Sequence, residues 1–182
     1  DLDLALTIDP TLEEAYTNRG RARIVTGDFQ GALDDFRKSS KLLQGQPQTS
    51  SVISKIAYAQ VLQGQALKNL GDPITSTRLI EQGLLSGWQS MWAGEALELL
   101  AELYESPDNF QELSAYEALV AEHPENGSVH FMHGMALFEI GQLQEAETDF
   151  TASIQMGLHF PRVYLSRALA RDIMNAPYWE TR

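Results

Sequence analysis

The sequence predicts an all-α protein built from pairs of amphipathic helices. Three observations lead to this fold class: apolar residues recur at helical spacing, glycines interrupt these stretches at matched places, and one part of the chain repeats another. No stretch alternates apolar and polar residues as a half-buried strand would. Asn126-Gly127, a common hairpin turn, lies between expected helices instead. A sheet is therefore not expected.

Two parts of the chain are similar when the sequence is compared with itself. A shift of 114 residues places Gly20 on Gly134 and Phe36 on Phe150. Six further positions coincide at the same shift: Ala22 with Ala136, Gly27 with Gly141, Gln30 with Gln144, Ala32 with Ala146, Asp35 with Asp149, and Ser39 with Ser153. Matches of this kind at fixed offsets indicate an internal repeat.

The expected helices follow one another with short interruptions. The first spans residues 2–8 and ends at the Asp9-Pro10 turn. The next two span residues 12–25 and 29–43, and Gly27 separates them because glycine readily takes the left-handed conformation that closes a helix. A later pair spans residues 129–140 and 143–156, separated at Gly141. Residues 161–174 predict a further helix, and Pro177-Tyr178-Trp179 the start of its partner.

Two of the helix pairs share a motif of large, small and aromatic positions. In the first pair these positions are Tyr16, Arg19-Gly20, Arg23, Ala32 and Phe36. In the later pair they are His130, His133-Gly134, Leu137, Ala146 and Phe150. Asp9-Pro10 and residues 123–126 match a turn that commonly closes such a pair. The motif resembles that of tetratricopeptide repeats, and the resemblance implies a right-handed superhelical solenoid of antiparallel helix pairs.

The resemblance covers nearly the whole chain and divides it into repeats. The eighth positions of the motif are Gly20, Gly64, Leu100, Gly134 and Ala168, spaced by 44, 36, 34 and 34 residues. We place the extra residues of the first interval in 44–54, as a longer loop or an added helical turn, and those of the second near residues 87–88.

One repeat domain over residues 1–182 is therefore expected, as an excerpt of a longer array. It comprises the tail of a preceding repeat (1–10), repeats at 11–45, 46–88 and 125–160, a degenerate repeat at 89–124, and the first helix of another at 161–182.

Charge is distributed unevenly along the chain, whose 182 residues carry a formal net charge of −12. Residues 1–91 hold 9 basic and 10 acidic side chains, whereas residues 92–182 hold 4 basic and 15 acidic side chains. Between Arg78 and Arg162 there are 14 acidic residues and no Lys or Arg. An acidic surface repels phosphate, which disfavours nucleic acids and anionic membranes as partners. The acidic stretch is either a solvated face or a docking surface for a basic partner.

Cysteine is absent, which excludes disulfides, thiolate zinc sites and a Cys nucleophile. No apolar run approaches the ~18 residues of a membrane helix. The first residues are not those of a signal peptide, and because the chain does not begin with Met we expect its natural N-terminus to be missing. We expect a soluble protein of the cytoplasm or a bacterial periplasm, with the choice of compartment open.

The motifs of common enzyme and cofactor sites are also absent. The sequence contains no phosphate-binding glycine loop, no G-x-S-x-G and no H-E-x-x-H, and its carboxylates form no matched acid and base. His130 and His133 are three residues apart, a spacing that two metal ligands can have, but they occupy the large packing positions of the motif. We therefore expect no enzyme activity, no cofactor and no metal.

The resemblance implies which side chains would face a partner. In tetratricopeptide proteins the first helices of successive repeats line a concave groove. The partner-binding residues that this assigns here are Asn18, Arg21, Tyr58, Gln65, Leu97, Tyr104, Phe131, Met135, Phe138 and Leu165. Phe131, Met135 and Phe138 would form an apolar patch for a partner's side chains. The alternative is that these apolar residues pack on neighbouring helices.

The function predicted from these observations is a non-catalytic scaffold that binds a peptide or amphipathic helix of another protein. A partner segment with apolar side chains and basic flanks would suit the acidic stretch. Two alternatives remain: a self-associating protein that forms homo-oligomers, and the regulatory region of a larger enzyme. The carboxylate clamp of chaperone-binding relatives is absent, because its positions hold Thr17, Arg21, Leu62, Gly94 and Glu98.

Overall fold

The computed structural model describes residues 1–176, and every regular element in that range is helical, as predicted. The helix start predicted at Pro177-Tyr178-Trp179 lies outside the described residues. The elements are α1 (Leu2–Ile8), α2 (Glu13–Thr26), α3 (Phe29–Gln44), α4 (Ser50–Asn69), α5 (Pro73–Gly87), α6 (Ala93–Leu103), a short 3-10 helix (Pro107–Asn109), α7 (Leu113–Glu122), α8 (Gly127–Glu139), α9 (Leu143–Gln155) and α10 (Pro161–Asn175). No helix among these residues is both long and apolar enough to cross a membrane.

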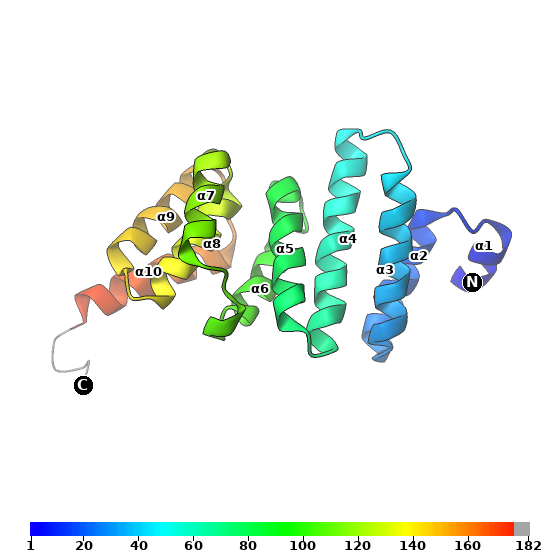
Figure 1. Cartoon of the computed structure of the whole chain (residues 1–182), viewed down its shortest axis with the longest axis horizontal. Coiled ribbons are helices and arrows are strands. Elements are labelled where there is room, and N and C mark those ends of the chain that lie inside the picture. The colour runs from blue at the N-terminus through cyan, green and yellow to red at the C-terminus, as the bar shows by residue number, and fades with distance from the viewer. Residues whose placement is uncertain (177–182) are drawn as a thin grey trace. The chain divides into compact units, whose positions relative to one another are not determined.

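The chain forms two compact units, which we describe separately (Figure 1). Unit 1 is Asp1–Leu103 and contains α1 to α6. Unit 2 begins at Tyr104 and contains α7 to α10. The division falls between α6 and α7, within the expected repeat at 89–124.

The α2–α3 pair of unit 1 is an antiparallel hairpin. Gly27 closes α2 with φ 82°, in the left-handed region that the sequence predicts for it. Contacts between the two helices run in opposite directions along the chain: Thr17 bonds Ser39, and Arg23 bonds the Gly31 carbonyl. Ala32, Leu33 and Phe36 of α3 pack with Leu62, Ala66 and Leu67 of α4 to form the core of this part of unit 1.

Helix α4 explains the long first interval between repeats. It spans 20 residues and begins at Ser50, where the Thr49 hydroxyl accepts a hydrogen bond from the Val52 amide. Residues 45–49 connect it to α3. Measured from the eighth positions, α3 ends three residues later than α9, and α4 begins seven residues earlier than α2. The ten extra residues therefore lengthen both helices, whereas the five-residue connection is as long as that between α9 and α10.

The α8–α9 pair of unit 2 repeats the geometry of α2–α3. Gly141 follows α8 with φ 80°, and Phe150 of α9 is fully buried where Phe36 lies in the first pair. A Cβ atom added at Gly134 would come within 2.8 Å of the Phe150 ring, and one at Gly20 within 2.5 Å of the Phe36 ring. In the two copies that carry the full motif, the structure thus confirms the predicted tetratricopeptide-like hairpin.

Asp35 and Asp149, which the shift of 114 residues aligns, bind different partners in the two pairs. Arg19 forms two hydrogen bonds to Asp35, at 2.9 and 2.6 Å, and Arg23 donates a third at 2.7 Å. In unit 2 both carboxylate oxygens of Asp149 face imidazoles: His130 Nδ1 lies 2.8 Å from Oδ1 and His133 Nδ1 lies 2.6 Å from Oδ2. A pair of guanidinium groups in the first hairpin is thus replaced by a pair of imidazoles in the second.

Candidate functional site

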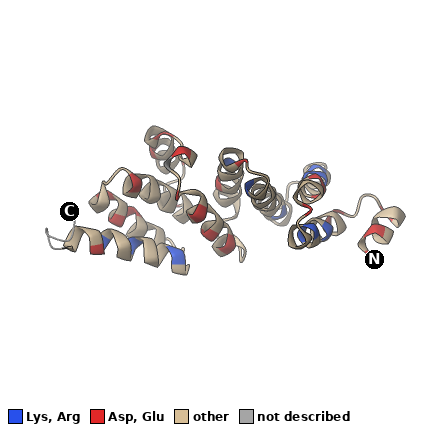
Figure 2. Ribbon diagram, turned by 90° about the horizontal axis from the view of Figure 1, so that it is seen from below, with Lys and Arg blue, Asp and Glu red and all other residues tan. Residues whose placement is uncertain are grey.

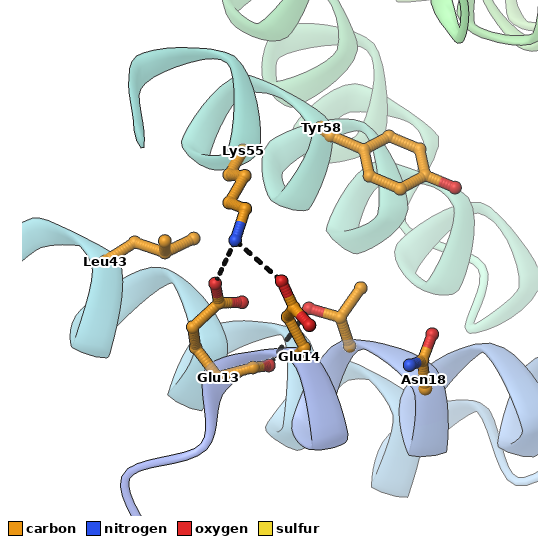
Figure 3. A pocket seen from close by; sticks show the side chains of 7 residues that line it. Glu13, Glu14, Asn18, Leu43, Lys55 and Tyr58 are labelled. Atoms are coloured by element: carbon orange, nitrogen blue, oxygen red, sulfur yellow. Dashed lines mark hydrogen bonds and ion pairs between the residues drawn. The ribbon is translucent and has the colours of Figure 1, made fainter. Parts of the chain in front are cut away.

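A cleft in unit 1 lies between the first helices of two consecutive pairs, α2 and α4 (Figure 3). Its volume is about 310 Å³. The residues that line it are Glu13, Glu14, Thr17, Asn18, Leu43, Lys55 and Tyr58. Two of them, Asn18 and Tyr58, are among the groove residues expected from the sequence, and we refer to this feature as the α2/α4 cleft.

Helical spacing brings the lining residues together. Glu14, Thr17 and Asn18 lie three and four residues apart, so they share one face of α2. Lys55 and Tyr58 likewise share one face of α4. The lengthened start of α4 contributes Lys55, which is not among the groove residues expected from the sequence. No sequence signal singles out this lysine, because the repeat motif does not extend into the inserted residues.

Ion pairs connect the two walls of the cleft. Lys55 Nζ lies 2.6 Å from Glu13 Oε1 and 2.9 Å from Glu14 Oε1, as the dashed lines in Figure 3 show. Hydrogen bonds to Glu13 and Glu14 raise the pKa of Lys55 above its ordinary value, although partial burial opposes the shift. Two carboxylates share one ammonium group, so the cluster keeps a net negative charge. The Glu14 side chain is 67% exposed and available to a second cation.

Tyr58 gives the cleft its aromatic surface. Its ring stacks on that of Trp92, with centroids 5.6 Å apart, which fixes the orientation of both side chains. Burial raises the pKa of the Tyr58 phenol, so its hydroxyl is neutral at physiological pH. Thr17 is held by hydrogen bonds to Ser39 at 2.8 Å and to the Glu13 carbonyl at 3.3 Å. Asn18 is exposed beside it.

The remaining expected groove residues of unit 1 occupy different environments. Arg21 is exposed on α2 and Gln65 is half-buried on α4, but neither lines the α2/α4 cleft. Both lie on the same two helices, one to two turns further along the chain.

In unit 2 the expected residues lie on α8 and α10. Met135 and Phe138 are half-buried on α8, and Leu165 is 48% exposed on α10. The two helices are neighbours: the Ser166 hydroxyl donates to Met135 Sδ at 3.5 Å. Leu169 is exposed one turn after Leu165. We call Met135, Phe138, Leu165 and Leu169 the α8/α10 patch.

Three of the expected partner-binding residues are buried, which corrects their assignment. Leu97, Tyr104 and Phe131 are 0%, 2% and 0% exposed. The Phe131 ring packs on that of Phe150 at 6.0 Å, and the Tyr104 ring stacks on that of Phe110 at 4.1 Å. These three side chains are therefore buried within their units. The alternative, that apolar groove residues pack on neighbouring helices, applies to Phe131, whose ring packs on Phe150 of α9.

His130 and His133 are packed between helices and lie against a carboxylate. His130 bridges Asp149 and the Pro124 carbonyl, at 2.8 and 3.0 Å. His133 approaches Asp149 without the directional geometry of a hydrogen bond. Within residues 1–176, no group of three or more His, Cys, Asp or Glu side chains is arranged to hold a metal ion.

Charge on the two units follows the sequence asymmetry. Figure 2 shows Lys and Arg on helices of unit 1 and on α10. Helices α6 to α9 carry Asp and Glu but no Lys or Arg. Several of the acidic side chains on this stretch are exposed, among them Glu105, Glu117, Glu122 and Glu145.

Comparison with protein-family models and with curated protein sequences finds no match. Several solved structures are similar to the chain, among them the following two. One is YrrB, described as a TPR protein with an unusual peptide-binding site; it is 16% identical, with a TM-score of 0.49, and the match covers 95% of this chain and 83% of that one. The other is the TPR2AB domain of yeast Sti1 in complex with pHSP90, also 16% identical, with a TM-score of 0.42 and coverage of 95% and 75%.

Proposed function

We propose that the chain is a non-catalytic scaffold that binds a segment of another protein on the exposed faces of its first helices. The observation that supports this most directly is the α2/α4 cleft, where polar groups, two carboxylates and an aromatic ring converge from two consecutive helix pairs. A cleft that is mostly open, with an aromatic surface and a few placed polar groups, suits a peptide better than an enclosed small molecule.

The chemistry of the cleft selects a basic side chain on the partner. Glu13 and Glu14 already share Lys55, and a Lys or Arg of the partner would supply a second cation to Glu14. Tyr58 offers a flat surface on which the stem of that side chain, or an apolar neighbour, can pack. Asn18 can both donate and accept hydrogen bonds.

The α8/α10 patch selects an apolar side chain. Leu165 and Leu169 expose apolar area to water, and Met135 adapts readily to different ligand shapes. Taken separately, the cleft suits Lys or Arg and the patch suits Leu, Phe or Met, and an amphipathic segment with basic flanks offers both kinds of side chain. Exposed charge pairs contribute about 0–1 kcal/mol each, so the apolar contacts supply most of the affinity and the acidic field mainly speeds association.

A short fluorescent peptide of Leu and Lys, with leucines three and four residues apart, tests the proposal by anisotropy. We expect Tyr58→Ala to weaken binding about tenfold, a change of about 1.4 kcal/mol, and Glu14→Lys to weaken it about fivefold at most, because an exposed charge pair contributes no more than about 1 kcal/mol. Asp34→Lys is the matched control, because Asp34 is an exposed carboxylate of the same unit outside the cleft. Equal losses for Glu14→Lys and Asp34→Lys would show non-specific attraction and contradict the proposal.

Leu165→Glu tests the patch in unit 2 with the same peptide. We expect weaker binding than for Ile140→Glu, which places the same charge at another exposed apolar residue of unit 2.

Light scattering of the protein alone at increasing concentration tests the alternative function, which is self-association. If the chain forms oligomers that Leu165→Glu dissociates, the patch serves self-association rather than partner binding.

A further inference from the structure

A second groove in unit 1 follows the other side of α4. Two cavities of about 420 and 400 Å³ adjoin there and share Ile56 and Gln60. The first extends over α3 and the second over α5, the two helices that pack on either side of α4 (Figure 1). Successive helical residues are about 100° apart, so Ile56 and Gln60 point well away from Lys55 and Tyr58 of the α2/α4 cleft. We call this feature the outer groove.

The floor of the outer groove is apolar. Ile53 is 41% exposed, and Ile56, Leu79 and Leu85 are half-buried. These four side chains come from α4 and α5, which pack on each other along most of their lengths. Apolar area of this kind in a hollow is a typical contact surface for side chains of a partner.

The rim over α3 is cationic. Arg37 and Lys41 are exposed, line the groove and lie four residues apart, so they share one face of the helix and repel each other. No carboxylate is among the residues that line either cavity, and neither cation forms an ion pair within the described part of the chain. In a protein with a net charge of −12, this is an unneutralised positive site.

The groove is also held in shape by a hydrogen bond between its walls. The Gln63 side-chain amide of α4 donates to the Ser40 hydroxyl of α3 at 2.9 Å. Gln44 and Gln60 present further amide groups that can pair with the backbone of an extended or helical segment. A ligand would therefore meet a preformed surface, which lowers the entropic cost of binding.

We propose that the outer groove binds an acidic amphipathic segment of another protein. Its apolar side chains would cover Ile56 and Leu79, and its carboxylates would pair with Arg37 and Lys41. Arg37 can bind a carboxylate through two parallel hydrogen bonds. This partner has the opposite charge to the one proposed for the α2/α4 cleft, so the two sites would recognise different segments. Nucleic acid fits less well, because two cations over an apolar floor cannot follow a phosphate backbone.

The test uses a short fluorescent peptide of Leu and Glu, with the same leucine spacing as the Leu/Lys peptide. We expect the intact chain to bind it and Arg37→Glu/Lys41→Glu to weaken binding at least tenfold. Lys38→Glu/Arg78→Glu is the matched control: both residues are exposed in the same unit, line neither cavity and change the charge by the same amount. This control should change the affinity less than twofold, and Tyr58→Ala in the cleft should leave it unchanged.

Several results would overturn the proposal. Equal losses for the two double variants would mean non-specific attraction to the basic helices. Equal binding of a peptide with Ser in place of Leu, or competition by inorganic phosphate alone, would mean an anion site without a docking groove. Self-association that Arg37→Glu/Lys41→Glu abolishes would mean that a second copy of the chain occupies the groove. Absence of binding to the intact chain would also reject it, without affecting the proposal for the α2/α4 cleft.

Discussion

At the scale of single residues, Gly20 and Gly134 determine how closely the helices of each pair approach. The space that a Cβ atom would need is taken by the Phe36 and Phe150 rings, at 2.5 and 2.8 Å. A larger side chain must therefore displace an aromatic ring that is fully buried in the core.

Substitution of these glycines should destabilise the fold. We expect Gly20→Leu and Gly134→Leu each to lower the free energy of unfolding by about 1–3 kcal/mol or more, because overpacking shifts the neighbouring helix. Ala22→Leu, at an exposed position of α2, is the control and should change stability little. Thermal unfolding followed by circular dichroism measures all three. If the glycine variants unfold at the same temperature as the control, the close approach has no energetic importance.

Phe131 should contribute to stability rather than to direct partner contact. Its side chain is 0% exposed and packs on Phe150. Phe131→Ala leaves a cavity and should cost about 3–5 kcal/mol in urea unfolding. Phe138→Ala, at a half-buried position of the same helix, should cost less. A Phe131→Ala variant of normal stability that binds the Leu/Lys peptide poorly would restore Phe131 to the binding surface.

His130 should make the stability of unit 2 depend on pH. Both of its ring nitrogens face acceptors, Asp149 Oδ1 and the Pro124 carbonyl, and only the protonated ring can donate to both. The hydrogen bond to Asp149 raises the pKa of His130 above its ordinary value of 6.5, while burial opposes the shift. The stabilisation is therefore fully present below about pH 6.5 and is lost as pH rises through the raised pKa.

Urea unfolding at several pH values between about 6 and 9 measures this effect. We expect stability to fall across that range and His130→Gln to reduce the fall. In unit 1 the equivalent carboxylate, Asp35, is paired with Arg19 and Arg23, which stay charged throughout. A pH dependence that His130→Gln leaves intact would assign the effect to other groups.

At the scale of elements, side-chain caps define where several helices begin. Asp72 precedes α5, and its carboxylate accepts a hydrogen bond from the Thr75 amide at 3.1 Å. We expect Asp72→Ala to lower the free energy of unfolding by about 1 kcal/mol, and Asp72→Asn to keep most of the stability, because Asn can also cap. Chemical unfolding of the two variants gives the comparison. Equal losses would mean that charge rather than capping is important at this position.

Most helix bounds could be predicted because glycine and proline mark them. Residues 2–8 form α1 as expected, and α2 and α3 are separated at Gly27 as expected. The repeat motif leaves the start of α4 open between a loop and an added turn, because the motif does not extend into these residues, although Gly45, Pro47 and the capping Thr49 mark it. The exposed face of α8 could not be identified either. Phe131, Met132, Ala136 and Leu137 are all buried, so this helix is apolar on more than one side.

At the scale of the whole molecule, the candidate sites carry different charges. In unit 1 the α2/α4 cleft holds Glu13 and Glu14, whereas the outer groove holds Arg37 and Lys41. The sequence predicted the first site in part, through the positions that it assigned to α2 and to Tyr58. It did not predict the outer groove, because Arg37 and Lys41 share that surface with α4 and α5 only after folding. Composition alone, with its net charge of −12, gives no sign of a cationic groove.

Amide NMR spectra recorded during titration with the Leu/Lys peptide test most directly whether the chain binds a protein segment at the α2/α4 cleft. We expect saturable shifts in unit 1 that centre on Thr17, Asn18 and Tyr58 and that disappear in Tyr58→Ala. Shifts centred on Ile56 and Gln60, or small shifts spread evenly over the exposed acidic residues, would contradict it.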